Sequence, residues 1–310
     1  MASRIIGERN RGKEKSPFKV KWLSQCFGIS RQAFYKKLAN AEKELKQRDE
    51  IIQLVADKRA EISQQTGGRK LHHLLKEDFQ ALEIKMGRDK LFDFLRANSL
   101  LVPKLKNFHR TTNSNHNFKK YKNLVKDRVP QGPEELWVSD ITYLALNGRH
   151  AYLALVTDAY SKEIMGYKVS TNMKASLTLD ALKMALKNRK YPHKHLIHHS
   201  DRGFQYCWPE YVELLENSEI LVSMTEQYDP YENALAERIN RTLKYEFGLN
   251  QIIGNKSLAK KMVKRAVRIY NELRPHESLG NRTPKDVHLN GNQPYKSYRK
   301  NKEVKYLNLN

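Results

Sequence analysis

The sequence predicts a multidomain protein in which N-terminal helical units precede an α/β core, a mixed five-stranded sheet flanked by helices. Two observations lead to this expectation. Residues 20–102 show apolar side chains at helical spacing with breaks at glycines, whereas residues 137–224 hold three strand-like runs and then helix and strand in alternation. A length of 310 residues leaves room for two or three domains.

The charge is strongly positive and unevenly distributed. The formal net charge is +23, with 30 basic and 14 acidic residues in positions 1–130 against 27 and 20 in positions 131–310. Such a bias is expected if the N-terminal part holds a phosphate backbone, and a solvated basic surface is the alternative.

The cysteine pattern and hydropathy exclude other classes. Cys26 and Cys207 lie far apart and neither belongs to a C-x-x-C pair, which argues against a disulfide framework and a cysteine zinc site. No apolar run approaches the ~20 residues of a membrane span. We expect a soluble protein of a reducing, cytoplasmic compartment.

Residues 1–16 read as a disordered basic arm, and residues 17–48 show a helix-turn-helix outline. An apolar first helix is followed by a turn at Gly28, and Ser30 is the expected N-cap of a second helix, Arg31 to Leu38. An ordinary helical hairpin is the alternative. If the unit binds DNA, the second helix presents Arg31, Gln32, Tyr35 and Lys36.

Leu38, Leu45 and Ile52 recur every seven residues and suggest a short coiled coil that pairs two subunits. The series stops at Arg59, short of the three or four heptads normally required, so a plain amphipathic linker helix stays open.

Residues 49–102 read as a second helical unit. Helices are expected at residues 51–62, at residues 70–79 after Gly67-Gly68, and from Gly87 onward. Its expected phosphate contacts are Arg69, Lys70, Arg88 and Lys90. Residues 103–133 are polar and basic, lack periodicity, and are expected to form an extended linker along DNA phosphates.

The core is expected at residues 134–289, followed by a basic, mobile tail at residues 290–310. Its elements are strands at residues 137–146, 150–160 and 163–170, a helix at 177–187, a strand at 195–200, a helix at 209–217 and a strand at 220–224. This order is that of the ribonuclease-H-like fold.

Three acids stand out in this frame. Asp140 lies within the first strand, Asp201 follows the fourth, which neighbours the first in this architecture, and Glu237 opens a helix expected to reach about Phe247. Three carboxylates suit a two-metal phosphoryl-transfer site, in which two Mg²⁺ ions lie roughly 3.5–4 Å apart.

The contexts of these acids, His199-Ser200-Asp201-Arg202-Gly203 and Asn233-Ala234-Leu235-Ala236-Glu237, together with the closing segment at residues 270–284, resemble one family. The chain is similar to DDE transposases with a retroviral-integrase-like catalytic core, closest to the "IS three" family of bacterial insertion-sequence transposases. The resemblance covers residues 134–289, and more loosely 50–102, where the family has a second helix-turn-helix that helps to recognise the terminal inverted repeats.

The resemblance implies that Asp140, Asp201 and Glu237 are catalytic and hold two Mg²⁺ ions per site, with Mn²⁺ as a substitute. It implies DNA contacts by Lys244, which lies two helical turns after Glu237 and aligns with a basic residue common in the family. Further phosphate candidates are Arg202, Arg238 and Arg241. We interpret Asp158 as a structural residue or as one that supports the catalytic acids. We interpret His198, His199 and His276 as packed or hydrogen-bonded residues, because Mg²⁺ prefers oxygen ligands.

The sequence thus predicts a transposase that binds the inverted repeats of an insertion sequence, cleaves a DNA strand and transfers it. Its partners would be double-stranded DNA, as element ends and target, and a second copy of the chain, at the bacterial nucleoid. An integrase or nuclease with another DNA substrate, and a DNA-binding regulator with an idle core, are the alternatives.

Overall fold

The computed structural model describes residues 20–103, 118–126, 128–226, 234–292 and 305–307. The chain divides into two compact units between Lys58 and Arg59. The predicted arm at residues 1–16 lies outside the described residues, as do residues 104–117 and 127 of the linker and most of the tail.

The first unit contains the predicted pair of helices. Helix α2 (Val20–Cys26) ends in a turn where Gly28 has φ +62°, a conformation that glycine adopts without strain. Ser30 Oγ accepts a hydrogen bond from Ala33 N at 3.1 Å, which is the expected cap. Helix α3 then runs over 31 residues, Arg31–Glu61.

This single helix contains the predicted helix at residues 31–38, the continuous helical stretch predicted from Leu38 to Ile52, and nearly all of the helix predicted at residues 51–62. Residues 31–61 contain neither glycine nor proline, so nothing interrupts the helix across the expected boundary at residue 48. In the heptad series Leu45 is 52% exposed, and pairing through this seam stays a prediction.

The second unit begins with three short helices, α4 (Gly68–Leu74), α5 (Lys76–Ala81) and α6 (Arg88–Ala97). The expected helix at residues 70–79 is therefore interrupted at Leu75. The apolar core of this part is formed by fully buried leucines: Leu71, Leu75, Leu91 and Leu95. Helix α4 packs closely on α6, since a Cβ at Gly68 would lie 2.9 Å from the Phe92 ring.

The core contains one five-stranded mixed sheet, which confirms the predicted fold class. The strands are β2 (Leu136–Leu146), β3 (Arg149–Asp158), β4 (Ile164–Ser170), β5 (Leu196–Ser200) and β6 (Ile220–Met224). Their order is β4-β3-β2-β5-β6, with β2, β3 and β4 antiparallel and β2, β5 and β6 parallel.

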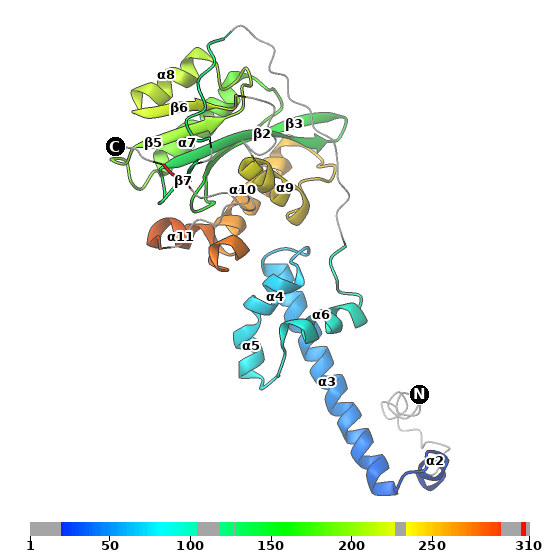
Figure 1. Cartoon of the computed structure of the whole chain (residues 1–310). Helices are drawn as coiled ribbons and strands as arrows, with labels where there is room; N and C mark the ends of the chain where they lie inside the picture. The colour runs from blue at the N-terminus through cyan, green and yellow to red at the C-terminus, as the bar shows by residue number, and fades with distance from the viewer. Residues whose placement is uncertain (1–19, 104–117, 127, 227–233, 293–304, 308–310) are drawn as a thin grey trace. The chain divides into compact units, whose positions relative to one another are not determined.

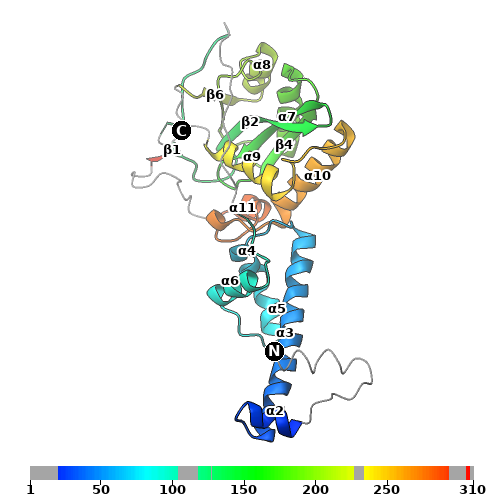
Figure 2. The ribbon, with the colours of Figure 1, turned by 90° about the vertical axis from the view of Figure 1, so that its right-hand side faces the viewer.

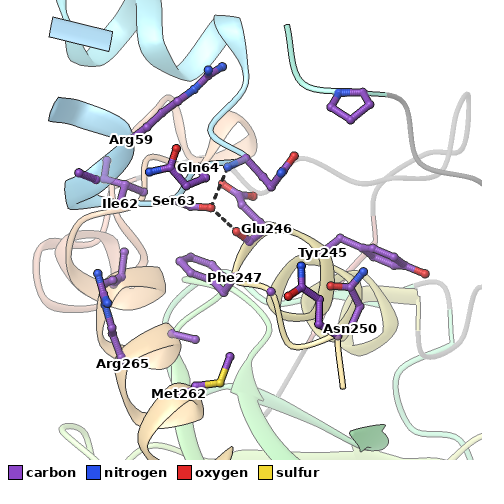
Figure 3. Close-up of a pocket in the computed structure, with 17 residues that line it drawn as sticks. Arg59, Ile62, Ser63, Gln64, Tyr245, Glu246, Phe247, Asn250, Met262 and Arg265 are labelled. Carbon is purple, nitrogen blue, oxygen red and sulfur yellow. Dashed lines mark hydrogen bonds between the residues drawn. The ribbon is translucent and has the colours of Figure 1, made fainter. Parts of the chain in front are cut away.

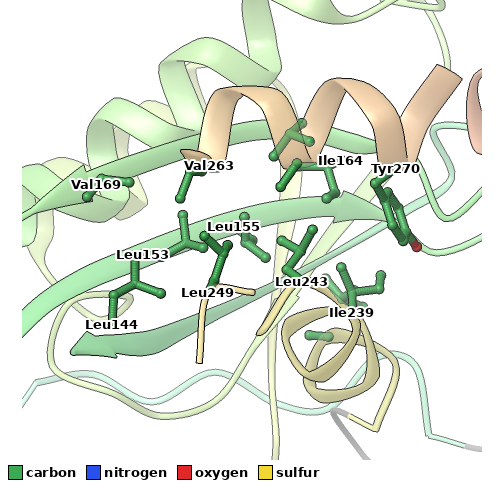
Figure 4. Close-up of a cluster of buried hydrophobic side chains, with 14 of the residues drawn as sticks. Leu144, Leu153, Leu155, Ile164, Val169, Ile239, Leu243, Leu249, Val263 and Tyr270 are labelled. Atoms are coloured by element: carbon green, nitrogen blue, oxygen red, sulfur yellow. The ribbon is translucent and has the colours of Figure 1, made fainter. Parts of the chain in front are cut away.

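Helices cover both faces of the sheet (Figures 1 and 2). One face carries α7 (Ala175–Asn188) and α8 (Pro209–Asn217) over a core that includes Trp137 and Tyr211. The other carries α9 (Ala234–Glu246) and α10 (Lys256–Glu272). Figure 4 shows leucines of β2 and β3 meeting side chains of these two helices.

Close packing fixes the first of these layers. A Cβ at Gly166 on β4 would lie 2.1 Å from the Ala181 carbonyl oxygen of α7, so no larger residue fits there. After α10 the chain closes with a short 3-10 helix, Glu277–Leu279, and α11 (Pro284–Asn290).

Asp158 has the structural role that we predicted. Its buried carboxylate accepts hydrogen bonds from the backbone N–H groups of Glu134 and Ser161, at 2.7 Å each, and from Tyr160 N at 3.1 Å. It therefore ties the start of β2 to the turn after β3.

The linker was predicted to be extended and the C-terminal tail to be mobile, but both are partly packed against the core. Residues 305–306 form strand β7 (Lys305–Tyr306), which pairs in parallel with β1 (Arg128–Val129), and Leu307 is buried in the core. The linker from Phe118 onward contacts the core, whereas residues 104–117 lie outside the described ranges. Within those ranges, no helix has the length and hydropathy to cross a membrane.

Candidate active site

Strand register aligns the two aspartates. Strands β2 and β5 pair in parallel with Val138 opposite His199. Continuing that register by two residues aligns Asp140 with Asp201, just beyond the last residue of β5. Because side chains alternate along a strand, Asp140 shares the face of Val138, the face that α9 and α10 cover.

Glu237 reaches this place from α9. The helix packs its buried side chains, among them Ile239 and Leu243, against the face of β2 that carries Asp140 (Figure 4). Glu237 lies in the first turn, where the helix dipole stabilises a negative charge. Its side chain is half-buried, between the core and solvent.

The three acids are electrostatically coupled. Burial, and after it the neighbouring charges of Asp201 and Glu237, raise the pKa of Asp140 to about 7, although two hydrogen bonds act to lower it. These two bonds come from Ile141 N at 2.9 Å and Asn240 Nδ2 at 2.8 Å. Negative charge is therefore concentrated around Asp140. Ionisation of the Asp140 carboxyl is unfavourable there without a cation.

The role of Asn240 was not predicted from the sequence. It lies one turn after Glu237 on α9, and its buried amide donates to Asp140 Oδ2. Its Oδ1 is buried without a hydrogen-bond partner among the described residues. The helical spacing of positions 237, 240 and 244 could have indicated a shared face, but the contact to a strand 100 positions away has no local signal.

A tight turn holds Asp201. Gly203 N donates to Asp201 Oδ1 at 3.0 Å, and a Cβ at position 203 would lie 2.9 Å from that oxygen. Glycine therefore leaves space for the carboxylate.

Lys244 adds a cation on the same helix. Burial lowers the pKa of its ammonium, and the charge of Asp140 opposes that effect, so the two groups lie within electrostatic range. Arg238 and Arg241 are exposed on α9, and Arg202 is half-buried after Asp201. The structure thus brings four of the predicted residues into one region: Asp140, Asp201, Glu237 and Lys244.

The predicted histidine roles agree with their surroundings. His198 is buried, with Nε2 2.7 Å from Ser139 Oγ and 2.9 Å from Tyr211 OH, and burial lowers its pKa to about 3. His199 is buried against Ser223, and burial lowers the pKa of His276 to about 3. These rings are packed within the fold.

The predicted DNA contacts of the helical units differ in their surroundings. Arg31, Gln32, Tyr35 and Lys36 are exposed at the start of α3. Exposed Arg69 pairs with Glu277 and exposed Arg88 with Asp89, while Lys90 donates to the Lys85 carbonyl.

Lys70 is the exception. Its side chain is 20% exposed and its ammonium binds Glu246 at 2.7 Å, while Arg274 binds the same carboxylate at 2.8 Å. We therefore revise its expected phosphate contact to a structural one. Nearby, Ser63 Oγ donates to the Glu246 carbonyl, beside a cavity of about 590 Å³ lined by the end of α9 and by α10 (Figure 3).

The donor set suits a hard divalent cation. Oxygen atoms, the ligands that Mg²⁺ prefers, are offered by Asp140, Asp201, Glu237 and Asn240 Oδ1, which has no hydrogen-bond partner in the described part of the chain. Within the described residues, no three acidic, imidazole or thiol side chains converge into a ready-made metal site. Mutual repulsion of the acids is consistent with that separation.

The chain is similar to transposition proteins. Two family profiles described as "Integrase core domain" match residues 130–230 and 218–284. An insertion element IS600 31 kDa protein of Shigella sonnei is 35% identical over 265 residues, which are 84% of this chain and 96% of that protein. The transposase InsF for insertion sequence IS3A of Escherichia coli K12 is 27% identical over 279 residues, 88% and 94% of the two chains.

Solved structures that match the chain include the integrase catalytic core domain of HTLV-2, determined in complex with magnesium. It is 18% identical, covers 52% of this chain and 99% of that domain, and has a TM-score of 0.41. An intasome structure of simian T-cell lymphotropic virus is also 18% identical, with coverage of 77% and 81% and a TM-score of 0.45.

Proposed function

Since the chain belongs to the integrase-core transposases of insertion sequences that are homologous to the IS three family, we propose that it binds the terminal inverted repeats of its element and catalyses Mg²⁺-dependent DNA cleavage and strand transfer. The observation that carries this proposal is the coupling of Asp140, Asp201 and Glu237 across two strands and one helix.

Asp140, Asp201 and Glu237 would hold two Mg²⁺ ions. When bound, Mg²⁺ activates the attacking oxygen, water or a DNA 3′-hydroxyl, and stabilises the leaving oxygen of an in-line displacement. Asn240 fixes the orientation of the Asp140 carboxylate, and Gly203 N does the same for Asp201. Lys244 supplies a positive charge for a phosphate near Asp140.

The remaining parts would hold DNA. We assign residues 17–48 and 49–102 to recognition of the element ends, with contacts by the exposed residues Arg31, Gln32, Tyr35, Lys36, Arg69, Arg88 and Lys90, and residues 134–289 to catalysis. Arg202, Arg238 and Arg241 would bind phosphates near the acids. Joining two ends requires at least a dimer, working on DNA in the bacterial cytoplasm.

The test uses duplexes with the sequences that flank this gene, as candidate element ends, and a plasmid target. We expect strand cleavage and joining with Mg²⁺ or Mn²⁺ and none with EDTA, while binding to the ends persists in EDTA. Binding with no cleavage under either metal would indicate the alternative function, a DNA-binding regulator with an idle core. Cleavage of every duplex, whether or not it carries an end, would indicate a nuclease.

Asn240→Ala is expected to raise the Mg²⁺ concentration needed for half-maximal cleavage roughly 10–100-fold, the usual effect of removing a group that orients a metal ligand. It also removes a hydrogen bond that lowers the pKa of Asp140, so the rise of activity with pH should move to higher pH. Asn217→Ala, at the exposed end of α8, is the control. An unchanged Mg²⁺ requirement and pH profile would contradict this role.

A further inference from the structure

The end of the linker is docked on the core near the acids. Leu124 N donates to Ser223 Oγ of β6 at 2.9 Å, and Asn123 N donates to Glu226 Oε1 at 3.1 Å. In return, Met224 N donates to the Lys122 carbonyl at 3.4 Å. Residues 122–124 are therefore fixed beside β6, at the edge of the sheet.

An aromatic contact fixes the segment further upstream. The Phe118 ring lies 5.5 Å from Phe204 and 5.7 Å from Trp208, and these two rings are 5.2 Å apart. Such tilted and edge-on pairs stabilise packing beyond the apolar area that they bury. Phe204 lies three residues after Asp201, so Phe118 anchors the linker to the loop that carries a catalytic acid.

Lys120 lies between these anchors. Its side chain is exposed and makes no hydrogen bond or ion pair with any residue in the described ranges, whereas Lys119 Nζ lies 4.9 Å from the centroid of the Tyr121 ring. Burial, and after it the charge of Asp201, raise the pKa of the Cys207 thiol to about 11, while Lys120 and Arg202 act to lower it. Lys120, Arg202 and Asp201 therefore act on one thiol and lie in one neighbourhood.

We propose that Lys120 binds a backbone phosphate of the DNA strand that passes the Asp201 loop, and that Phe118 positions it there by packing on Phe204 and Trp208. The proposal rests on the proposed function. It assigns the linker a fixed part in the active site, in addition to its general attraction to DNA.

Charge and position favour a phosphate as the ligand. An exposed ammonium next to a carboxylate site would otherwise form an ion pair with it, yet Lys120 forms none within the described part of the chain. Lys120 comes from the linker, Arg202 from the loop after β5 and Lys244 from α9. Cations from three separate elements would thus hold a strand near the acids, which fixes its orientation.

The experiment measures binding of the full-length protein to an end-bearing duplex over a range of salt concentrations, with Ca²⁺ in place of Mg²⁺. Lys120→Gln is expected to lower the slope of log K against log salt by about 0.9 per subunit, the loss of one phosphate contact. Lys183→Gln, an exposed lysine on α7, is the control and should leave the slope unchanged.

Phe118→Ala separates positioning from charge. It is expected to lower the slope as Lys120→Gln does, and the double variant should lose no more than either single one, because both remove the same contact. Phe118→Leu, which keeps an apolar anchor, should recover part of the loss.

Each outcome decides a separate point. If the native chain binds with the expected slope and Lys120→Gln does not change it, the assignment of Lys120 is wrong and the transposase proposal stands. If Phe118→Ala and Lys120→Gln reduce the slope additively, Phe118 does not act through Lys120. If the native chain binds no duplex, both proposals fail.

Discussion

Replacing Asp140 by asparagine is expected to abolish strand cleavage and transfer and yet to stabilise the fold at neutral pH and above. Loss of a carboxylate that holds the metal should reduce the rate by about 10²- to 10³-fold or more. Glu237→Gln and Asp201→Asn should reduce it similarly, while binding of the element ends survives.

The gain in stability follows from the pKa of Asp140, which rises to about 7 in the fold. An acid whose folded pKa lies above its unfolded value, about 3.9, destabilises the fold as pH rises between the two. Above pH 7 the native carboxylate is charged and costs stability, whereas the neutral amide of the Asp140→Asn variant would not. We expect a gain on the order of 1–3 kcal/mol in EDTA, vanishing below about pH 4.

Thermal and urea unfolding of the native chain and of Asp140→Asn, in EDTA and across this pH range, measure whether the substitution stabilises the fold. Asp180→Asn is the matched control, since Asp180 forms a half-exposed ion pair with Lys168, and its removal should change stability by less than about 1 kcal/mol. A destabilised Asp140→Asn would show that the carboxylate is a structural anchor, as Asp158 is. Full activity in Asp140→Asn would remove it from the catalytic site.

The elements that the sequence predicted well are those with strong local patterns. Helix α8 and strand β6 have the expected bounds because a proline opens the helix and a short, nearly continuous apolar run marks the strand. The order of strands then placed Asp140 beside Asp201, since the ribonuclease-H-like topology puts their strands together. The prediction of an insertion-sequence transposase family is confirmed by the integrase-core profiles together with the IS600 and InsF relatives.

What the sequence did not predict depends on contacts between distant residues. The bonds from Asn240 to Asp140 and from Leu124 to Ser223 join residues about 100 positions apart, and neither pair has a recurring local pattern. Lys70 was predicted to contact phosphate, whereas its partner Glu246 is 176 positions away in the sequence. Such pairs follow from how the layers pack.

Substitution of Glu246 is expected to destabilise the fold strongly. This carboxylate, 12% exposed, binds Lys70 and Arg274, the latter 9% exposed. Glu246→Leu leaves two largely buried cations without their anion and is expected to destabilise the fold by about 3–5 kcal/mol, as measured by urea unfolding. Glu277→Leu, which removes the exposed pair with Arg69, is the control and should cost at most about 1 kcal/mol.

The contribution of Glu246 should depend on pH. Burial acts to raise its pKa, but the charges and hydrogen bonds of Arg274 and Lys70 outweigh it, so the folded pKa lies below the ordinary value. Its stabilisation is therefore fully present above the unfolded pKa of about 4.3 and is lost as pH falls through the folded pKa. The gap between the native chain and Glu246→Gln should narrow below about pH 4; a constant gap would mean that packing, not charge, stabilises this end of α9.

Glu246→Gln also tests whether a loss of stability at the end of α9 affects the acids at the active site. Glu246 ends the helix whose first turn holds Glu237, and α9 also carries Asn240 and Lys244. Loosening its last turn should raise the Mg²⁺ requirement for cleavage even at temperatures where Glu246→Gln is folded. If the Mg²⁺ requirement stays native while stability falls, the ion cluster only holds α4 to the core, and packing of Ile239 and Leu243 alone positions the catalytic turn.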